Sequence, residues 1–414
     1  MQRESLKCKG VRDLVPHDMA TFRLIEHIFI DSCTKWGYEE VRTPTIEYLH
    51  LFTSAGTLST SLLNKVYSFL DWDGWSGERV SLRPDGTIPV ARLYMENLAK
   101  QKIDKLFYVT NVFSFEETKN ENRERWQCGV EYFGNSDPIS DFELLLLASN
   151  ILNKLQVKNI EIKLSHSKLL KLLFKEMNLD VDEEKKILSE VKEGKWKSLI
   201  ELNNHNSHTN SVFSIMLNMQ GCSTSFLENI KSLPNISTEL AIAIDTFASV
   251  TTLLDKFDVK YSIDITSTNT FEYYTGICYK FMHKAQTVAA GGRYDDLIPL
   301  LGGDRIPACG FALYVDPIMQ FAQQSLNIKN KNIVSLKILQ NNSKSLKSYF
   351  SLMEKLVENK FTVELYRAVN KNHYLWNISL GKKPNIFIVQ NNTSHQTSEL
   401  NSVNDVVNLI SKNK

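Results

Sequence analysis

The sequence predicts an α+β fold, in which helices surround an antiparallel sheet and a small α/β domain follows at the C-terminal end. Two alternating apolar segments, KLFYVTNVFSFEE and RWQCGVEYFGN, flank the charged loop TKNENRE, as in a long antiparallel hairpin. Strand and helix patterns alternate regularly only after about residue 332, which is typical of a small α/β domain. No G-x-G-x-x-G follows a strand and no Walker motif is present, so a dinucleotide-binding or P-loop fold is excluded.

The N-terminal part of the chain predicts a helix, two strands and a second helix. MATFRLIEHIFIDSCTKWGY has apolar residues at helical spacing, and Gly37 ends this helix. YEEVRTPTIEYL predicts a single strand that runs into Pro44. RVSLRPDGTIPVARLYMENL predicts a strand, a turn at Pro84-Asp85-Gly86 and a helix with Pro89 in its first turn.

The rest of the core domain, residues 1–324, follows the hairpin. The chain becomes helical after Phe142, and EIKLSHS predicts a strand at residues 161–167. Residues 168–256 are mostly helical in pattern and predict an insertion packed on the main sheet. Strands are expected again at KYSIDI, GICYKFM and TVAAGG, and a helix at Pro317–Gln324 closes the core.

A second domain is expected at residues 332–414, after a linker at Ser325–Asn332. Its elements are predicted as strand IVSLKIL, a helix at residues 345–359, strand TVELY, a polar helical stretch, strand NIFIVQ and a last helix at residues 403–411. Alternation of this kind suits parallel strands with crossover helices.

Length and composition limit the possible classes of protein. A chain of 414 residues is too long for one ordinary core, and its net charge of +1 gives no support for a broad nucleic-acid surface. Six cysteines without a C-x-x-C pair predict free thiols and no metal site. No apolar run reaches the roughly 18 residues that span a bilayer, and no signal-peptide pattern is seen. We therefore expect a cytoplasmic protein without a membrane partner.

Four short segments contain candidate binding residues. In LRPDGT, Asp85 and Thr87 could hold an amine or a hydroxyl, but the local sequence favours the alternative, a turn with a helix N-cap. In WQCGVE, Gln127 and Glu131 share one face of a strand, which is either a pocket wall or the solvent face of a hairpin.

The other two segments are EYYTG and GGRYDDL. Tyr273 and Tyr274 are predicted on opposite faces of a strand, so at most one would enter a pocket, and a buried core tyrosine is the alternative. Gly291-Gly292 allows close approach of a ligand or another strand, and is also compatible with an ordinary bulge.

In this order, the motifs resemble the catalytic core of class II histidyl-tRNA synthetases. KGVRDLVP, LRPDGT, the FYVTNVFSFEE…RWQCGVEYFG hairpin, EYYTG, AAGGRYDDL and ACGFAL span about residues 7 to 320. The resemblance implies a class II aminoacyl-tRNA synthetase-like antiparallel sheet flanked by helices. It also implies that the histidine-binding positions of this family are kept in Asp85, Thr87, Gln127, Glu131, Tyr273 and Tyr274.

The chain departs from that family where adenylation needs cations. Ser114 stands where the family has an arginine, Asn269 replaces the histidine-specific arginine, and Asp316-Pro317 replaces a Glu-Arg pair. Loss of one charge-stabilising donor typically costs about 100- to 1,000-fold in rate. Arg123 and Arg125 of the hairpin loop could compensate only in part. We therefore expect no catalytic residues and no cofactor.

A retained amino-acid pocket without adenylation chemistry is similar to the regulatory subunits of ATP phosphoribosyltransferase. This resemblance implies a non-catalytic chain that a short-form catalytic subunit requires for activity in the first step of histidine biosynthesis. It also implies histidine as feedback effector, self-association into dimers within a hetero-octamer, and no nucleic-acid partner. The alternatives are an active histidyl-tRNA synthetase and a synthetase-like paralogue with another binding role.

Overall fold

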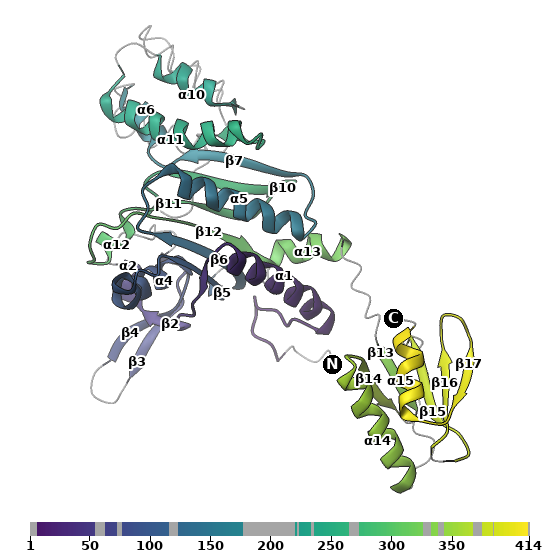
Figure 1. Ribbon diagram of the computed structural model, residues 1–414. Helices are drawn as coiled ribbons and strands as arrows, with labels where there is room; N and C mark the ends of the chain where they lie inside the picture. The colour runs from purple at the N-terminus through teal and green to yellow at the C-terminus, as the bar shows by residue number, and fades with distance from the viewer. Residues whose placement is uncertain are drawn as a thin grey trace, which may run out of the picture. The chain divides into compact units, whose positions relative to one another are not determined.

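A computed structural model gives the structure of the chain as two compact units, residues 1–326 and 327–414 (Figure 1). The residues that it describes are 6–53, 63–72, 77–115, 123–176, 220–221, 223–232, 236–264, 273–325, 333–337, 343–366, 375–383 and 385–412. The linker predicted at Ser325–Asn332 lies, apart from its first residue, outside them. Each unit is therefore described by itself.

The first unit is built on a nine-stranded sheet in the order β1-β5-β6-β12-β11-β10-β7-β9-β8. Apart from the parallel pairs β1/β5 and β7/β9, the strands pair antiparallel. The strands are β1 (Glu39–Glu40), β5 (Lys105–Phe113), β6 (Glu124–Phe133), β7 (Ile160–His166), β8 (Gln220–Gly221), β9 (Ser262–Asp264), β10 (Ile277–His283), β11 (Gln286–Arg293) and β12 (Ala308–Tyr314). The predicted α+β class is confirmed.

The predicted hairpin forms the second and third strands of this sheet. β5 and β6 pair antiparallel, with Thr110 opposite Gln127 and Tyr108 opposite Gly129. β12, from the ACGFAL segment, pairs with β6 on its other side, so β6 is buried between two neighbours. The sequence pattern did not predict β12 as a strand, because its small residues carry no clear alternation.

Helices α1 (Pro16–Lys35) and α5 (Pro138–Lys154) lie across the strands of the sheet, and α13 (Val315–Ser325) packs beside α1 (Figure 1). Their apolar faces and the sheet share one core cluster that includes Phe29, Leu147, Phe281 and Ile318. Asp137 begins α5 by accepting a hydrogen bond from Ile139 N at 2.8 Å, and Pro138 occupies the first helical position.

A three-stranded sheet, in the order β2-β4-β3, extends from the nine-stranded sheet (Figure 1). It comprises β2 (Ile46–Tyr48), β3 (Ser68–Trp72) and β4 (Gly77–Leu82), and a short helix, α2 (Leu49–Thr53), follows β2. After β4 the chain forms α4 (Thr87–Leu93), a π-helical turn (Tyr94–Leu98) and a 3₁₀ turn (Ala99–Gln101). The single strand predicted for YEEVRTPTIEYL is therefore wrong: β1 and β2 belong to different sheets. The segment that connects β1 to β2 is held by buried Arg83, which donates hydrogen bonds to the carbonyls of Thr43 and Pro44 at 2.9 and 3.0 Å.

The described part of the predicted insertion is mainly helical. It contains α6 (Leu169–Glu176), α10 (Thr224–Lys231) and α11 (Thr238–Lys256), while residues 177–219 lie outside the description. Ser237 caps α11 by accepting a hydrogen bond from Leu240 N at 3.2 Å. α11 packs on α5, which joins the insertion to the sheet.

The second unit contains a five-stranded mixed sheet in the order β14-β13-β15-β16-β17, with α14 (Ser343–Glu358) and α15 (Val403–Lys412). The strands are β13 (Ile333–Lys337), β14 (Thr362–Tyr366), β15 (Trp376–Leu380), β16 (Phe387–Asn391) and β17 (Thr397–Leu400). The expectation of parallel strands holds only for β13, β14 and β15. β16 pairs antiparallel with β15, and β17 pairs antiparallel with β16. The predicted polar helical stretch also includes a strand, β15, whose residues alternate between buried and half-buried.

Among the helices of the described residues, none has the length and apolar character needed to cross a membrane.

Candidate ligand pocket

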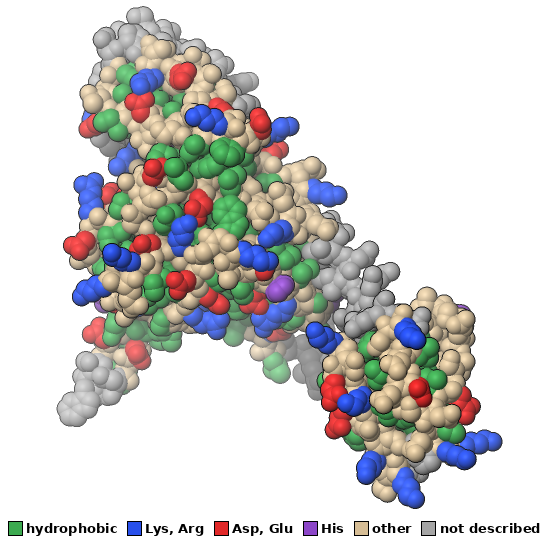
Figure 2. Space-filling model, viewed as in Figure 1, with side chains coloured by type: hydrophobic (Ala, Val, Ile, Leu, Met, Phe, Trp, Pro, Cys, Tyr) green, Lys and Arg blue, Asp and Glu red, His purple; other side chains and the backbone are tan. Residues whose placement is uncertain are grey.

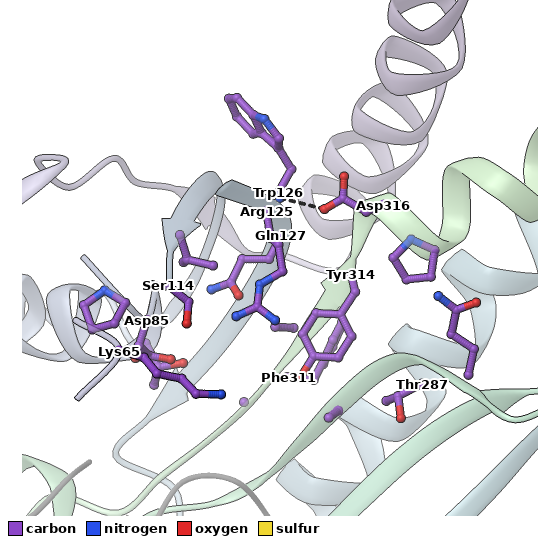
Figure 3. Close-up of a pocket in the computed structure, with 18 of the residues that line it drawn as sticks. Lys65, Asp85, Ser114, Arg125, Trp126, Gln127, Thr287, Phe311, Tyr314 and Asp316 are labelled. Atoms are coloured by element: carbon purple, nitrogen blue, oxygen red, sulfur yellow. Dashed lines mark hydrogen bonds between the residues drawn. The ribbon is translucent and has the colours of Figure 1, made fainter. Parts of the chain in front are cut away.

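A cavity of about 370 Å³ opens in the first unit between β5, β6, β11, β12 and the turn before α4 (Figure 3). Five of the six residues expected to bind histidine line it: Asp85, Thr87, Gln127, Tyr273 and Tyr274. The sixth, Glu131, is not at the cavity surface but lies directly behind it, where it contacts the lining residue Tyr294. The fold thus brings together residues that are up to 189 positions apart in the sequence.

Asp85 has two roles that the sequence could not separate. Its Oδ1 accepts a hydrogen bond from Ile88 N at 2.8 Å, so it caps the first turn of α4. It is also buried and lines the cavity beside Thr87. Burial raises the pKa of Asp85 to about 6, because the low-dielectric surroundings disfavour its charge.

Gln127 and Glu131 face inward from β6, so the alternative of a solvent-exposed hairpin face is wrong. Their exposed fractions are 6% and 1%. Gln127 Nε2 is buried without a hydrogen-bond partner among the residues that the structure describes. A buried donor in that state is costly, so it indicates an acceptor atom that a ligand would bring.

Glu131 is held by two tyrosines that the sequence did not single out. The hydroxyl of Tyr294 donates a short hydrogen bond to Oε2, and the hydroxyl of Tyr108 donates one to Oε1 at 3.1 Å. Burial, opposed by these hydrogen bonds, raises the pKa of Glu131 to about 8. Tyr108 has an inward position on β5, so strand alternation could have found it. Tyr294 lies within the GGRYDDL motif, directly after the end of β11.

Tyr273 and Tyr274 both line the cavity, so the prediction that only one could enter a pocket is wrong. The two residues belong to a turn, and the strand begins only at Ile277. Thr275 N donates to the Arg293 carbonyl at 2.8 Å and fixes this turn. The ring centroids of Tyr273 and Tyr274 lie 4.9 Å apart, and Tyr273 meets Tyr294 edge-on at 5.7 Å. The aromatic wall therefore comes from a turn held by long-range contacts.

Gly310 on β12 provides the space for the Glu131 carboxylate. A Cβ atom on Gly310 would lie 1.9 Å from Glu131 Oε2 and 2.5 Å from the Val130 carbonyl oxygen. Gly129 similarly leaves room for the Tyr108 ring, which a Cβ there would meet at 2.1 Å. Two glycines on adjacent strands thus allow a carboxylate and a tyrosine to lie within the sheet.

We expect Gly310→Ala to abolish the stabilisation of the first unit by a pocket ligand. The added methyl group must displace Glu131 or move β6, which typically destabilises a packed core by about 1–3 kcal/mol. Thermal unfolding without histidine and with about 10 mM histidine, a concentration that saturates even a site with a millimolar Kd, measures both effects. Gly302→Ala is the control, because a Cβ at Gly302 would meet no heavy atom within 4 Å, although its φ of 90° adds local strain. A full ligand response in Gly310→Ala would contradict this expectation.

The wall of the cavity also carries positive charge. Arg12, Lys65 and Arg125 line it, and Arg12 forms an ion pair with Asp316. The cavity is also lined by Ser114 and Pro317. At these two positions the synthetase pattern has an arginine. The third such position, Asn269, lies outside the described residues. Arg123 does not line the cavity and instead stacks on Phe115, with Cζ 4.3 Å from the ring centroid.

The chemistry of the cavity suits a small molecule that carries both a cation and an aromatic ring. Buried carboxylates at Asp85 and Glu131 compensate an ammonium or imidazolium group, and the tyrosine rings pack against a flat ring. An antiparallel sheet, flanking helices and a cavity of this composition are the features of a class II aminoacyl-tRNA synthetase-like protein.

Comparison with known proteins places the chain within this class. The sequence model of the family "Histidyl-tRNA synthetase" matches residues 10–318. A solved structure described as an ATP phosphoribosyltransferase regulatory subunit/histidyl-tRNA synthetase from Bacillus halodurans superposes with a TM-score of 0.74 at 22% identity, covering 90% of this chain and 95% of the other. A histidine–tRNA ligase of Methanococcus aeolicus is 31% identical over 88% of both chains.

A higher similarity is found with an ATP phosphoribosyltransferase regulatory subunit of Dehalococcoides mccartyi, which is 39% identical over 98% of both chains. The chain therefore belongs to the histidyl-tRNA synthetase family and, within it, to the ATP phosphoribosyltransferase regulatory subunits. The family resemblance inferred from the ordered motifs is confirmed.

Proposed function

We propose that this chain is the non-catalytic regulatory subunit of a cytoplasmic ATP phosphoribosyltransferase, which catalyses the first step of histidine biosynthesis. One observation carries the proposal: the pocket keeps a buried acidic and aromatic cradle, while Ser114 and Pro317 stand where adenylation would need arginines. The name of the Dehalococcoides mccartyi relative supports the same function. A short-form catalytic subunit is the partner, and it requires this chain for activity.

Histidine is the effector that the cradle fits. Asp85 and Thr87 line the cavity as partners of the α-ammonium group, Gln127 lines it as a donor to an acceptor atom of the ligand, and Glu131 lies behind as a partner of the ring. Allosteric control needs a ligand that binds two states of an assembly with different affinity, and a coupling of about 1–3 kcal/mol is enough. A pocket with buried acidic groups can supply that difference.

Self-association completes the proposed assembly, with dimers of this chain in a hetero-octamer of four plus four chains. The three-stranded sheet exposes five large apolar side chains, a composition that favours burial in an interface: Ile46, Tyr48, Phe69, Leu70 and Trp72. Elsewhere, Lys and Arg side chains are interspersed with Asp and Glu over the face seen in Figure 2, without a continuous basic stripe. This mixed charge supports the absence of a nucleic-acid partner.

Co-expression with a short-form ATP phosphoribosyltransferase tests the proposal. We expect the two chains to co-purify, the catalytic chain to gain most of its activity from the complex, and histidine to inhibit that activity. Light scattering should give the mass of a four-plus-four assembly. A catalytic chain that is fully active alone and does not bind this chain would contradict the proposal, and would favour a paralogue with another role.

An active histidyl-tRNA synthetase remains the second candidate, because Lys65 and Arg125 place positive charge at the pocket. The 31% identity to the Methanococcus aeolicus ligase also favours it. Histidine-dependent exchange of pyrophosphate into ATP separates the two functions. We expect no exchange above background, since the two described arginine positions of the synthetase hold Ser114 and Pro317. Brisk exchange would establish the synthetase instead.

A further inference from the structure

A second apolar stripe runs along α14 of the second unit, next to the face that packs on the core. The core face of this helix is formed by four buried residues: Ser345, Tyr349, Leu352 and Leu356. Each of them is followed directly by an apolar residue, and these four make up what we call the α14 stripe: Leu346, Phe350, Met353 and Val357. Successive residues of an α-helix are about 100° apart around its axis. The α14 stripe therefore points to the side of the helix and not into the core of its own unit.

The α14 stripe is exposed to solvent at two of its four positions. Phe350 and Val357 are 50% and 52% exposed, and no other large apolar side chain in the described part of the second unit is exposed to this extent. Leu346 and Met353 are half-buried. Burial of apolar surface is favourable roughly in proportion to its area. The stripe therefore favours contact with another apolar surface.

The α14 stripe points toward the β14 edge of the five-stranded sheet. α14 connects β13 to the parallel strand β14, and crossovers of this kind are right-handed. With this hand, the stripe points past β14 and away from α15, which packs on β16 and β17 (Figure 1). β14 is the edge strand of its sheet. A second molecule that approaches along this side meets both the stripe and a strand edge, at which chains commonly pair.

The spacing of the α14 stripe suits a second helix as the contacting surface. Leu346 and Met353 are seven residues apart, and so are Phe350 and Val357. A seven-residue repeat of two apolar residues keeps them on the line along which two helices meet, at positions d and a of a heptad. The stripe extends over about 16 Å of helix. The matching surface is therefore long and narrow, as the side of another helix is.

Charges beside the α14 stripe indicate that the second helix is another copy of α14. Lys347 and Glu354 are also seven residues apart, and both flank the stripe on its solvent side, at heptad position e. In an antiparallel pair of identical helices the e positions face each other, so Lys347 of each copy lies opposite Glu354 of the other. A parallel pair would instead bring them to the g positions, Tyr349 and Leu356, which are buried in the core. The charges therefore suit two copies that run in opposite directions.

We propose that the α14 stripe is an interface between two copies of this chain, in which the α14 helices of two second units pack antiparallel. Phe350 of one copy then packs on Met353 of the other, and two symmetric pairs of Lys347 with Glu354 flank the contact on its solvent side. The inference goes beyond the proposed function, because it depends neither on the ligand pocket nor on the catalytic partner. Three helical turns bury less than the roughly 800 Å² per partner of an independent interface. This contact therefore adds to the one proposed through the three-stranded sheet of the first unit.

Sedimentation equilibrium of the full chain tests this interface. Phe350→Glu places a charge in the middle of the α14 stripe, and we expect it to raise the Kd of self-association at least about 10-fold. Lys347→Glu and Glu354→Lys each put like charges opposite each other twice, and each should raise the Kd about 10-fold. An equimolar mixture of these two variants should associate as tightly as wild type, because every flanking pair between the two different chains again has opposite charges.

Lys344→Glu is the matched control, because Lys344 is exposed on the same helix but points away from both the stripe and the core. It should keep the wild-type Kd, and melting temperatures verify that all variants fold. An unchanged Kd in Phe350→Glu, or an equal loss in Lys344→Glu and Lys347→Glu, would overturn the interface and leave self-association through the first unit intact.

Charge variants that remain weakly associated when mixed would overturn the antiparallel pairing of two copies. Wild type that stays monomeric at every concentration would overturn the interface together with the self-association proposed above. Co-purification with the catalytic chain tests the proposed function independently of these results.

Discussion

Replacing Asp141 by alanine is expected to lower the free energy of unfolding of the first unit by about 3 kcal/mol. The buried Arg293 guanidinium would lose one of its two carboxylate partners and keep only Asp295, at 3.1 Å. Asp141 Oδ2 accepts hydrogen bonds from Arg293 Nε and Nη2 at 3.0 and 2.7 Å. The two side chains are only 2% and 5% exposed. Native-state hydrogen exchange of the β11 amides measures the loss.

The same substitution should weaken ligand binding. The Arg293 carbonyl accepts the hydrogen bond from Thr275 N that holds the turn of Tyr273 and Tyr274. Asp31→Ala is the matched control, because it removes an exposed ion pair between the Asp31 carboxylate and Lys35 Nζ, which are 2.8 Å apart. The two residues lie one helical turn apart on α1. An exposed pair of this type contributes little to stability. A loss below about 1 kcal/mol in Asp141→Ala would contradict this expectation and show that Asp295 alone compensates the charge of Arg293.

The second large effect is a loss of stability of the ligand-free protein as the pH rises. The pKa of Glu131 is raised from 4.5 to about 8 by burial, so the folded protein holds a proton that the unfolded chain releases. Its contribution to stability is complete below the unfolded pKa and is lost as the pH rises through the folded pKa. Between about pH 5 and about pH 8 the expected loss is on the order of 3–4 kcal/mol.

Glu131→Gln isolates this contribution, since it places a permanently neutral group of the same shape beside Tyr108 and Tyr294. Urea unfolding of wild type and variant across this pH range should give curves that diverge with rising pH, the variant becoming relatively more stable. Glu124→Gln, a half-exposed position on the same strand, should follow wild type. Parallel curves for wild type and Glu131→Gln would show that Glu131 is ionised in the folded protein already at low pH.

Local sequence patterns predicted the elements that have a regular alternation of side chains or strong local turn preferences. The β5/β6 hairpin was predicted because both strands alternate along their length, and the turn before α4 because Pro84-Asp85-Gly86 has strong local preferences. Prediction failed where distant residues fix the backbone. Tyr273 and Tyr274 lie in a turn held from β11, and YEEVRTPTIEYL is divided between two sheets by the contacts of Arg83. Such contacts leave no periodic signal in the sequence.

The candidate site shows the same division. Sequence motifs indicated Asp85, Gln127 and Glu131, but left open whether the face of β6 looks into a pocket or toward solvent. β12 and its glycines decide this, because they close over β6 and leave room for the carboxylate. Tyr108 and Tyr294 then determine how Glu131 is held.

The order of its motifs by itself determined the family of this protein, its α+β core and the set of polar residues available to a ligand. Tertiary structure alone decided that Glu131 lies behind the cavity surface, that both tyrosines of EYYTG line the cavity, and that Arg125 and Lys65 line it too. The reason is physical: side-chain periodicity reports which residues share a face of one element. Convergence of several elements depends on strand register and on turns that long-range hydrogen bonds hold in place.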